Sequence, residues 1–193
     1  MRKHSVEKFI DEDTIKSYVG KIAGHIIADY KGLEDRVEDI SHEGLTFITV
    51  LDGAKTFASD LMIEIWKIDP TLKIRNYFIK LSSYGQSIVS SGKVIVKKEI
   101  EGDIKNKDVI IIEDLVETGN TLNFLKDYLI ETKSVSSVKI CALLDKQASK
   151  GKINVSIDYK GVEIPDEFIV GYGVDYAEKY RELPYIGIVK FKE

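Results

Sequence analysis

The chain has 193 residues, 44% of them apolar and 31% charged, a composition that suits one globular domain with a sizeable core. Its formal net charge of −4 gives no electrostatic reason to expect a nucleic-acid partner. The single cysteine, Cys141, excludes an internal disulfide framework and is typical of a reducing compartment. Residues 1–8 lack the apolar core of a signal peptide, and no apolar stretch reaches transmembrane length, so we expect a cytoplasmic protein.

The first predicted element is a helix from about Asp13 to Tyr30, with Asp13 as its N-cap. Apolar residues recur there at helical spacing and predict one buried face: Ile15, Val19, Ile22 and Ile26. We interpret this segment as a packing helix.

A buried strand is predicted over residues 45–51, and residues 52–54 then open a second helix. Three apolar residues share one face of that helix: Phe57, Leu61 and Ile65. Trp66 is expected in the core at the end of the helix. Because the first N–H groups of a helix lack backbone partners, this strand-glycine-helix unit can bind an anion.

Residues 73–81 predict a third strand, and strand signals return at residues 94–96. Between them, residues 82–92 are dominated by serine and glycine. A polar loop of this length is either a functional lid or a disordered connection, and the pattern alone does not choose between them.

The chain is organised around residues 108–122. The branched residues 109–112 predict a strand buried on both faces of a parallel sheet. Two acids follow, Glu113 and Asp114, and then a hydroxyl-rich turn at residues 117–121. A helix is predicted next from apolar residues at helical spacing: Leu122, Leu125 and Leu129.

That order predicts a site for a phosphorylated sugar. Ligands bind beyond the carboxyl ends of parallel strands, and the N-terminus of the next helix favours phosphate. Gly119 lets the backbone approach closely, while Thr118 and Thr121 supply hydroxyl donors. Two carboxylates would repel a phosphate unless they bind hydroxyls or a bridging Mg²⁺. From the pattern alone, an ordinary loop after a buried strand stays open as the alternative.

Residues 109–121 resemble the phosphoribosyl-pyrophosphate (PRPP) motif of the type I phosphoribosyltransferases, with one departure: Glu117 stands where the family usually has Asp. The resemblance implies that Glu117 is the general acid or base at N7 of a purine, and that Glu113 and Asp114 hold the ribose hydroxyls. The implied PRPP and 5′-phosphate site comprises Glu113, Asp114, Glu117, Thr118, Gly119, Asn120 and Thr121.

The departure at Glu117 leaves three outcomes open: the backbone compensates, the enzyme is slow, or catalysis is lost. The extra methylene moves the carboxylate by roughly 1.5 Å at fixed backbone. A misplacement of about 1 Å can cost on the order of a hundredfold in rate.

Two earlier loops also match the family. Asp52 and Gly53 correspond to the loop that binds pyrophosphate, although the family often has Lys in place of Asp52. Their backbone N–H groups remain available to the anion. Ser83 and Tyr84 match the family's mobile loop, which favours the lid interpretation.

Residues 137–144 predict another buried strand, and Lys146 lies just past its end. By residue type alone, Lys146 is a solvated loop residue, since charged side chains are seldom buried. The resemblance implies instead that Lys146 contacts the exocyclic oxygen of the purine.

Residues 162–184 resemble the hood of the hypoxanthine-guanine phosphoribosyltransferases. The resemblance implies that Phe168 stacks on the purine and that the backbone of Ile169 orients it. It places Asp175 beside the purine as a ligand of a second Mg²⁺, and it aims Arg181 at pyrophosphate. By residue type alone, Phe168 would be a core ring, Asp175 a surface acid and Arg181 a solvated cation.

The implied fold is the α/β type I phosphoribosyltransferase fold, with a central, mainly parallel sheet flanked by helices and a small hood. We expect one domain over residues 1–193, with its core at about 40–145 and a hood at about 146–193 plus part of the N-terminus. Residues 185–191 predict a closing strand.

The implied function is purine salvage: hypoxanthine or guanine joins PRPP to give the nucleoside 5′-monophosphate and pyrophosphate. Mg²⁺ is the implied cofactor, bound near Glu113, Asp114 and Asp175, and a homodimer or homotetramer is the implied assembly. Two alternatives stay open. One is a non-catalytic PRPP or nucleotide sensor, and the other is a phosphoribosyltransferase for xanthine, adenine or a pyrimidine.

Overall fold

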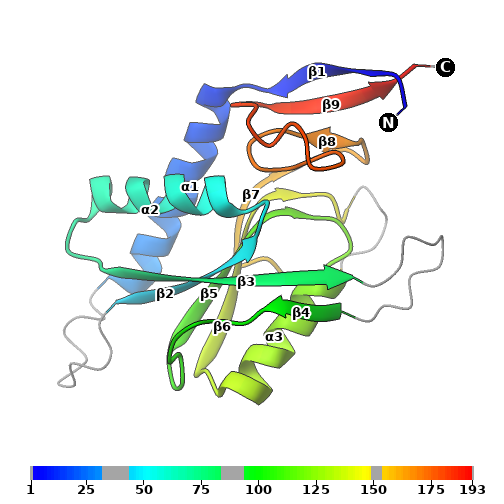
Figure 1. Ribbon diagram of the computed structural model, residues 1–193. Helices are drawn as coiled ribbons and strands as arrows, with labels where there is room; N and C mark the ends of the chain where they lie inside the picture. Colours follow the sequence, from blue (N-terminus) through cyan, green and yellow to red (C-terminus); the bar gives the residue numbers. More distant parts are fainter. Residues whose placement is uncertain (1, 32–43, 84–93, 149–153, 193) are drawn as a thin grey trace.

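A six-stranded sheet forms the centre of the protein, whose computed structural model describes residues 2–31, 44–83, 94–148 and 154–192 (Figure 1). The strand order is β4-β3-β2-β5-β6-β7, and every neighbouring pair is parallel except β3 and β4. The strands are β2 (Leu45–Leu51), β3 (Ile74–Ser83), β4 (Val94–Lys98), β5 (Asp108–Val116), β6 (Ser137–Asp145) and β7 (Tyr159–Glu163). Because the parallel strands lie in register, their carboxyl ends share one edge.

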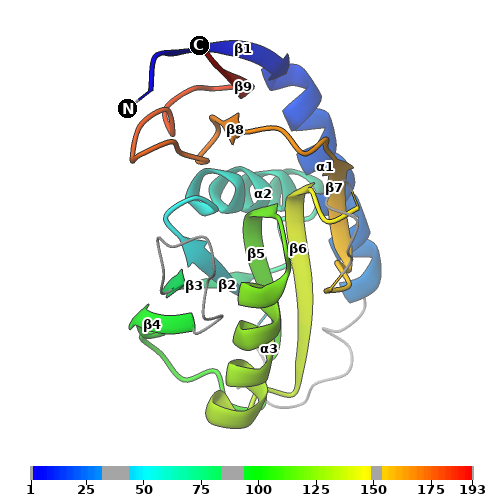
Figure 2. The ribbon, with the colours of Figure 1, turned by 90° about the vertical axis from the view of Figure 1, so that its right-hand side faces the viewer.

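Helices cover both faces of this sheet (Figure 1, Figure 2). Helices α1 (Glu12–Tyr30) and α2 (Lys55–Ile68) pack on one face, and α3 (Asn120–Lys133) packs on the other. In β5, Ile110 and Ile112 belong to the first core, while Val109 and Ile111 belong to the second. Burial on both faces explains the unbroken apolar run that predicts this strand.

A small antiparallel sheet lies beyond one end of the large one, with strand order β1-β9-β8 (Figure 1). Its strands are β1 (His4–Ile10), β8 (Ile169–Val170) and β9 (Ile186–Phe191), so both ends of the chain meet there. The α/β architecture with a mainly parallel sheet and a small second sheet is therefore confirmed. The division into core and hood stays a prediction, and β7 extends the large sheet although it falls in the range assigned to the hood.

Two details expected from the sequence are wrong. The N-cap of α1 is Asp11, whose carboxylate accepts the N–H of Thr14 at 2.8 Å, while Asp13 binds Lys16 instead. Trp66 is 64% exposed, whereas Phe57, Leu61 and Ile65 are buried as expected. Successive helical residues are about 100° apart, so Trp66 turns away from the buried face that Ile65 occupies.

Among the described residues, none of the helices combines the length and the apolar character that crossing a bilayer requires.

The two aromatic residues of α2 give a test of its orientation. Phe57→Ala is expected to lower the free energy of unfolding by about 3–5 kcal/mol, since the ring is fully buried. Trp66→Ala should cost less than about 0.5 kcal/mol, because the indole is mostly in solvent. Urea unfolding of both variants measures the two losses, and equal losses would contradict this placement.

Candidate active site

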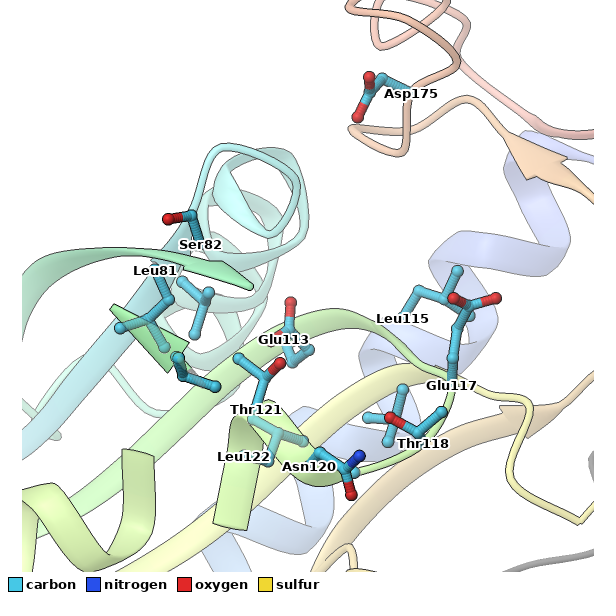
Figure 3. Close-up of a pocket in the computed structure, with 14 residues that line it drawn as sticks. Leu81, Ser82, Glu113, Leu115, Glu117, Thr118, Asn120, Thr121, Leu122 and Asp175 are labelled. Carbon is cyan, nitrogen blue, oxygen red and sulfur yellow. The ribbon is translucent and has the colours of Figure 1, made fainter. Parts of the chain in front are cut away.

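A cavity of about 670 Å³ opens at the edge where the parallel strands end (Figure 3). The turn after β5 and the first residues of α3 form its floor, and Asp175 lies across from them (Figure 3). The lining includes seven of the residues that sequence analysis assigned to the site: Glu113, Glu117, Thr118, Gly119, Asn120, Thr121 and Asp175.

Gly119 shapes the turn that opens α3. Its φ of +72° is left-handed, a conformation that favours glycine. A Cβ there would lie 2.7 Å from Val155 Cγ1 and 3.0 Å from Gln147 Oε1, so space also requires glycine. No side chain caps α3 and its first turn holds no acid, so the helix N-terminus is free to attract an anion.

A buried network, which the sequence pattern does not reveal, supports this turn from below. Gln147 is 1% exposed, and its Oε1 accepts the N–H groups of Asn154 at 3.0 Å and Val155 at 3.1 Å. The amide of Asn154 in turn donates to the carbonyl of Thr118 at 2.7 Å. The network fixes the backbone of the turn, yet a glutamine after a strand looks in sequence like any solvated loop residue.

The adjacent carboxyls of Glu113 and Asp114 lie close together at the end of β5. Burial, with the charge of Asp114, raises the pKa of Glu113 well above its usual range. Burial also raises the pKa of Asp114, and the two carboxyls are hydrogen-bonded to each other. The pair thus favours a shared proton in the ligand-free protein, and a cation or sugar hydroxyls would relieve the repulsion.

Magnesium fits this pair only with help from a ligand. The described part of the chain gathers no set of three or more His, Cys, Asp or Glu side chains that could hold a metal ion. Asp175 instead forms an ion pair with Arg181, at 2.7 Å between Oδ1 and Nη2. Mg²⁺ commonly takes one or two carboxylates and completes its shell with water and substrate phosphates, which Glu113 and Asp114 would permit.

Glu117 and Lys146 meet on the far side of the turn. Nζ of Lys146 lies 2.8 Å from Oε1 of Glu117 and 3.8 Å from Oδ1 of Asp166. The Lys146 side chain is only 5% exposed, so it is not the solvated residue that its type suggests. Glu117 is half exposed and reaches toward the open cavity that it lines (Figure 3).

The loop after β2 packs between the acidic pair and the segment after β8. A Cβ on Gly53 would lie 2.0 Å from Oδ2 of Asp114, and one on Gly173 would lie 2.1 Å from the carbonyl oxygen of Gly53. These contacts require glycine at both places. Arg181 joins the same group, since its Nη1 donates to the carbonyl of Gly173 at 2.6 Å.

Asp52, which begins this loop, is paired with a cation. Its Oδ2 lies 2.5 Å from Nζ of Lys80 on the neighbouring strand β3, and the peptide bond between Leu51 and Asp52 is cis. The hydrogen bond from Lys80 lowers the pKa of Asp52. Sequence analysis did not identify Lys80, because only the pairing of β2 with β3 brings it to Asp52.

Phe168 presents an exposed aromatic surface on the small sheet. The residue is 42% exposed and is held edge-on by Tyr176 and Phe191, at centroid distances of 5.1 and 5.8 Å. Ile169 beside it is buried in β8 and pairs with Ile188. Phe168 is therefore not the core residue that its type suggests, and its exposed ring can stack on a planar ligand.

Seven other predicted residues do not line this cavity: Asp52, Gly53, Asp114, Lys146, Phe168, Ile169 and Arg181. Arg181 lines a second cavity of about 460 Å³, formed with residues of α1 and α2. Of the expected lid, Ser83 ends β3 and pairs with Val94, and Tyr84 lies outside the described residues.

The raised pKa of Glu113 predicts a measurable effect on stability. The folded protein keeps a proton that the unfolded chain releases above its ordinary pKa of about 4.3, so stability falls as the pH rises from there. Glu113→Gln removes this titration. We expect a higher melting temperature for the variant at pH 8, by about 2–4 °C for each ~1 kcal/mol by which its free energy of unfolding increases.

Glu99 is the control, because the hydrogen bond from Lys133 lowers its pKa. Glu99→Gln should not raise the melting temperature at pH 8. Calorimetric melts of both variants at pH 5 and pH 8 make the comparison, and a Glu113→Gln protein that melts below the parent at pH 8 would contradict the assignment.

Comparison with known proteins places the chain in a family. Residues 9–177 match the phosphoribosyl transferase domain. The chain is 39% identical to the hypoxanthine-guanine phosphoribosyltransferase of Bacillus subtilis (strain 168), with 98% of this chain and 97% of that protein covered. It is 40% identical to the bifunctional protein TilS/HprT of Listeria innocua serovar 6a, and there the match covers 94% of this chain but only 25% of the longer protein.

A solved structure supports the same assignment. The hypoxanthine-guanine phosphoribosyltransferase of Bacillus anthracis str. 'Ames Ancestor', crystallised with HEPES in its active site, is 35% identical with a TM-score of 0.81. The superposition covers 97% of this chain and 99% of that one. The chain belongs to the phosphoribosyltransferase family and, within it, to the hypoxanthine-guanine phosphoribosyltransferases.

Proposed function

We propose that the protein joins hypoxanthine or guanine to PRPP and releases pyrophosphate and inosine or guanosine monophosphate, a reaction of purine salvage. The observation that carries the proposal is the turn at residues 117–121, which opens α3 and lines the cavity within a chain 39% identical to a hypoxanthine-guanine phosphoribosyltransferase. A sensor of the same fold would bind these ligands without turnover, so catalysis is the property to measure.

The sugar phosphate is assigned to the floor of the cavity. The uncapped N-terminus of α3 attracts the 5′-phosphate, and the hydroxyls of Thr118 and Thr121 donate to its oxygens. Gly119 and Asn120 complete the turn with backbone N–H groups. Glu113 and Asp114 accept hydrogen bonds from the ribose hydroxyls, and this contact offsets the repulsion between the two carboxyls.

The purine is assigned to the space between the turn and the small sheet. Its ring stacks on the exposed face of Phe168, beside the buried backbone of Ile169. Lys146 donates to the exocyclic oxygen at position 6, which hypoxanthine and guanine share. Asp175 closes the site from the opposite side (Figure 3).

Pyrophosphate is assigned to the loop after β2. The backbone N–H groups of Asp52 and Gly53 donate to it, and Arg181 supplies positive charge from the segment after β8. When bound, Mg²⁺ would be held through Glu113, Asp114 and Asp175 together with substrate oxygens, and it would neutralise the leaving pyrophosphate. Residues 83 and 84 are assigned to a lid that excludes water during the reaction.

The reaction forms a bond between N9 of the purine and the anomeric carbon as the bond from that carbon to pyrophosphate breaks. Positive charge develops on the sugar, and a proton must leave the purine. Glu117 is assigned to hold the proton of N7. Its contact with Lys146 at 2.8 Å orients the longer side chain, which is how glutamate replaces the family's aspartate in this proposal.

Glu117 is the residue whose change should separate catalysis from binding. Glu117→Gln keeps the size of the side chain but removes its proton chemistry, so kcat should fall by about a hundredfold or more. The Kd for inosine monophosphate should change less than about threefold, because the phosphate contacts remain. Steady-state kinetics and calorimetric titration measure the two constants.

Glu131→Gln, an exposed position on α3, is the matched control and should leave both constants unchanged. Parent-like turnover in the Glu117→Gln protein would remove Glu117 from the mechanism.

A substrate panel tests the function as a whole. Hypoxanthine, guanine, xanthine and adenine are each supplied with PRPP and Mg²⁺, and nucleotide and pyrophosphate are measured. We expect conversion of hypoxanthine or guanine, since adenine has an amino group where Lys146 requires an acceptor oxygen. Tight PRPP binding with no product from any base would favour the sensor instead.

A further inference from the structure

An ion pair stands where the pyrophosphate loop begins. The β2–β3 register sets Leu51 opposite Lys80, so Lys80 lies on the next strand beside the residue that follows Leu51. That residue is Asp52, and its Oδ2 lies 2.5 Å from Nζ of Lys80. The side chains are 49% and 42% exposed, so a ligand can reach both.

Contacts connect this pair to the rest of the site. Gly53 follows Asp52 and packs against the carboxylate of Asp114, and its carbonyl packs against Gly173. Gly173 holds the guanidinium of Arg181 at 2.6 Å. Lys80 and Arg181 are therefore both connected to the loop that begins with Asp52, Lys80 directly and Arg181 through Gly173.

The ion pair of Asp52 and Lys80 has an electrostatic role toward a bound anion, beyond that of an ordinary surface salt bridge. A carboxylate beside a bound pyrophosphate would repel it, and the repulsion grows as the two anions approach each other. The hydrogen bond from Lys80, with a smaller contribution from the charge of Arg181, lowers the pKa of Asp52, so this carboxylate stays ionised at neutral pH. An ammonium group has three donors, of which Asp52 uses one, so Lys80 keeps donors for phosphate oxygens.

Other cations in the described part of the site are less suited to this role. Lys146 is buried against Glu117. Lys55, the first residue of α2, is exposed and acts on Asp52 only through its charge, without a hydrogen bond to it. Lys80 combines direct contact with Asp52 and a position fixed by the sheet.

We propose that Lys80 binds the pyrophosphate group of PRPP and that Asp52 is the positioning residue whose carboxylate holds Lys80 there. The proposal rests on the proposed function and deepens it. It leaves the backbone N–H groups of Asp52 and Gly53 in their assigned role, and it gives the Asp52 carboxylate a role of its own.

The test compares Lys80→Met, Asp52→Asn and the double variant, with Lys55→Met as control. Calorimetry measures the Kd of Mg²⁺-pyrophosphate, and kinetics measure KM for PRPP and for hypoxanthine. Lys80→Met should weaken pyrophosphate binding and raise KM for PRPP by about tenfold or more, as expected for a lost charge-assisted hydrogen bond. KM for hypoxanthine should stay within about twofold, and Lys80→Arg should restore most of the affinity.

The double variant distinguishes direct contact between Lys80 and pyrophosphate from simple neutralisation of the Asp52 charge. If Lys80 binds pyrophosphate, the double variant recovers only part of the affinity that Lys80→Met loses, because removing the Asp52 charge relieves repulsion but restores no donor. Asp52→Asn alone then shows a smaller loss. Recovery of parent affinity in the double variant would overturn the proposal, because Lys80 would then only cancel Asp52. Parent-like binding in Lys80→Met would also overturn it.

The outcomes distinguish this inference from the proposed function. An inactive parent protein would count against the proposed function, while pyrophosphate titration would still report on Lys80. An active parent with an unaffected Lys80→Met variant would reject the role of Lys80 alone. Melting curves check that every variant folds. Because both side chains are exposed, misfolding would not explain a selective loss of pyrophosphate binding.

Discussion

The site depends on burial of β5 on both faces of the sheet. That burial confines the polar groups of the strand to its two ends, and the carboxyl end is the one where ligands of parallel sheets bind. Glu113, Asp114 and the turn at residues 117–121 occupy this end in immediate succession. A pair of carboxyls and an anion-attracting helix N-terminus are thus brought together by a single strand, and every other part of the site is arranged around them.

Acids at the site that are not part of the β5 pair meet cations. Glu117 contacts Lys146, Asp52 contacts Lys80, and Asp175 contacts Arg181. In each case one partner is assigned to the purine or to pyrophosphate. Ligand binding would therefore add contacts with substrate to groups that are already paired, and the existing ion pairs limit the cost of holding so many charges near a polyanion.

Local sequence patterns predict the parts of the fold that short-range interactions determine. The run at residues 109–112, the turn at Gly119 and the buried face of α2 all follow from short-range periodicity and backbone freedom. Trp66 was misplaced because hydrophobicity was given more weight than its angle on the helix. The N-cap was misplaced by two residues because several acids in a row offer the same capping chemistry.

The features that sequence patterns do not predict depend on pairing between residues far apart in the chain. Strands β1, β7 and β8 carry weak patterns of their own and form only because β9 and β6 provide partners. Lys80 and Asp52 are 28 residues apart, and Gln147 supports Thr118 only through Asn154. Lys146, Phe168 and Asp175 are identified by family resemblance alone, because their types favour a solvated lysine, a core ring and a surface acid.

The most direct measurement is a crystal structure of the protein with inosine monophosphate bound. The account requires the 5′-phosphate at the N-terminus of α3, the ribose hydroxyls on Glu113 and Asp114, and the hypoxanthine ring against Phe168. A nucleotide bound elsewhere, or with its phosphate away from residues 117–121, would contradict the assignment of this sheet edge as the active site.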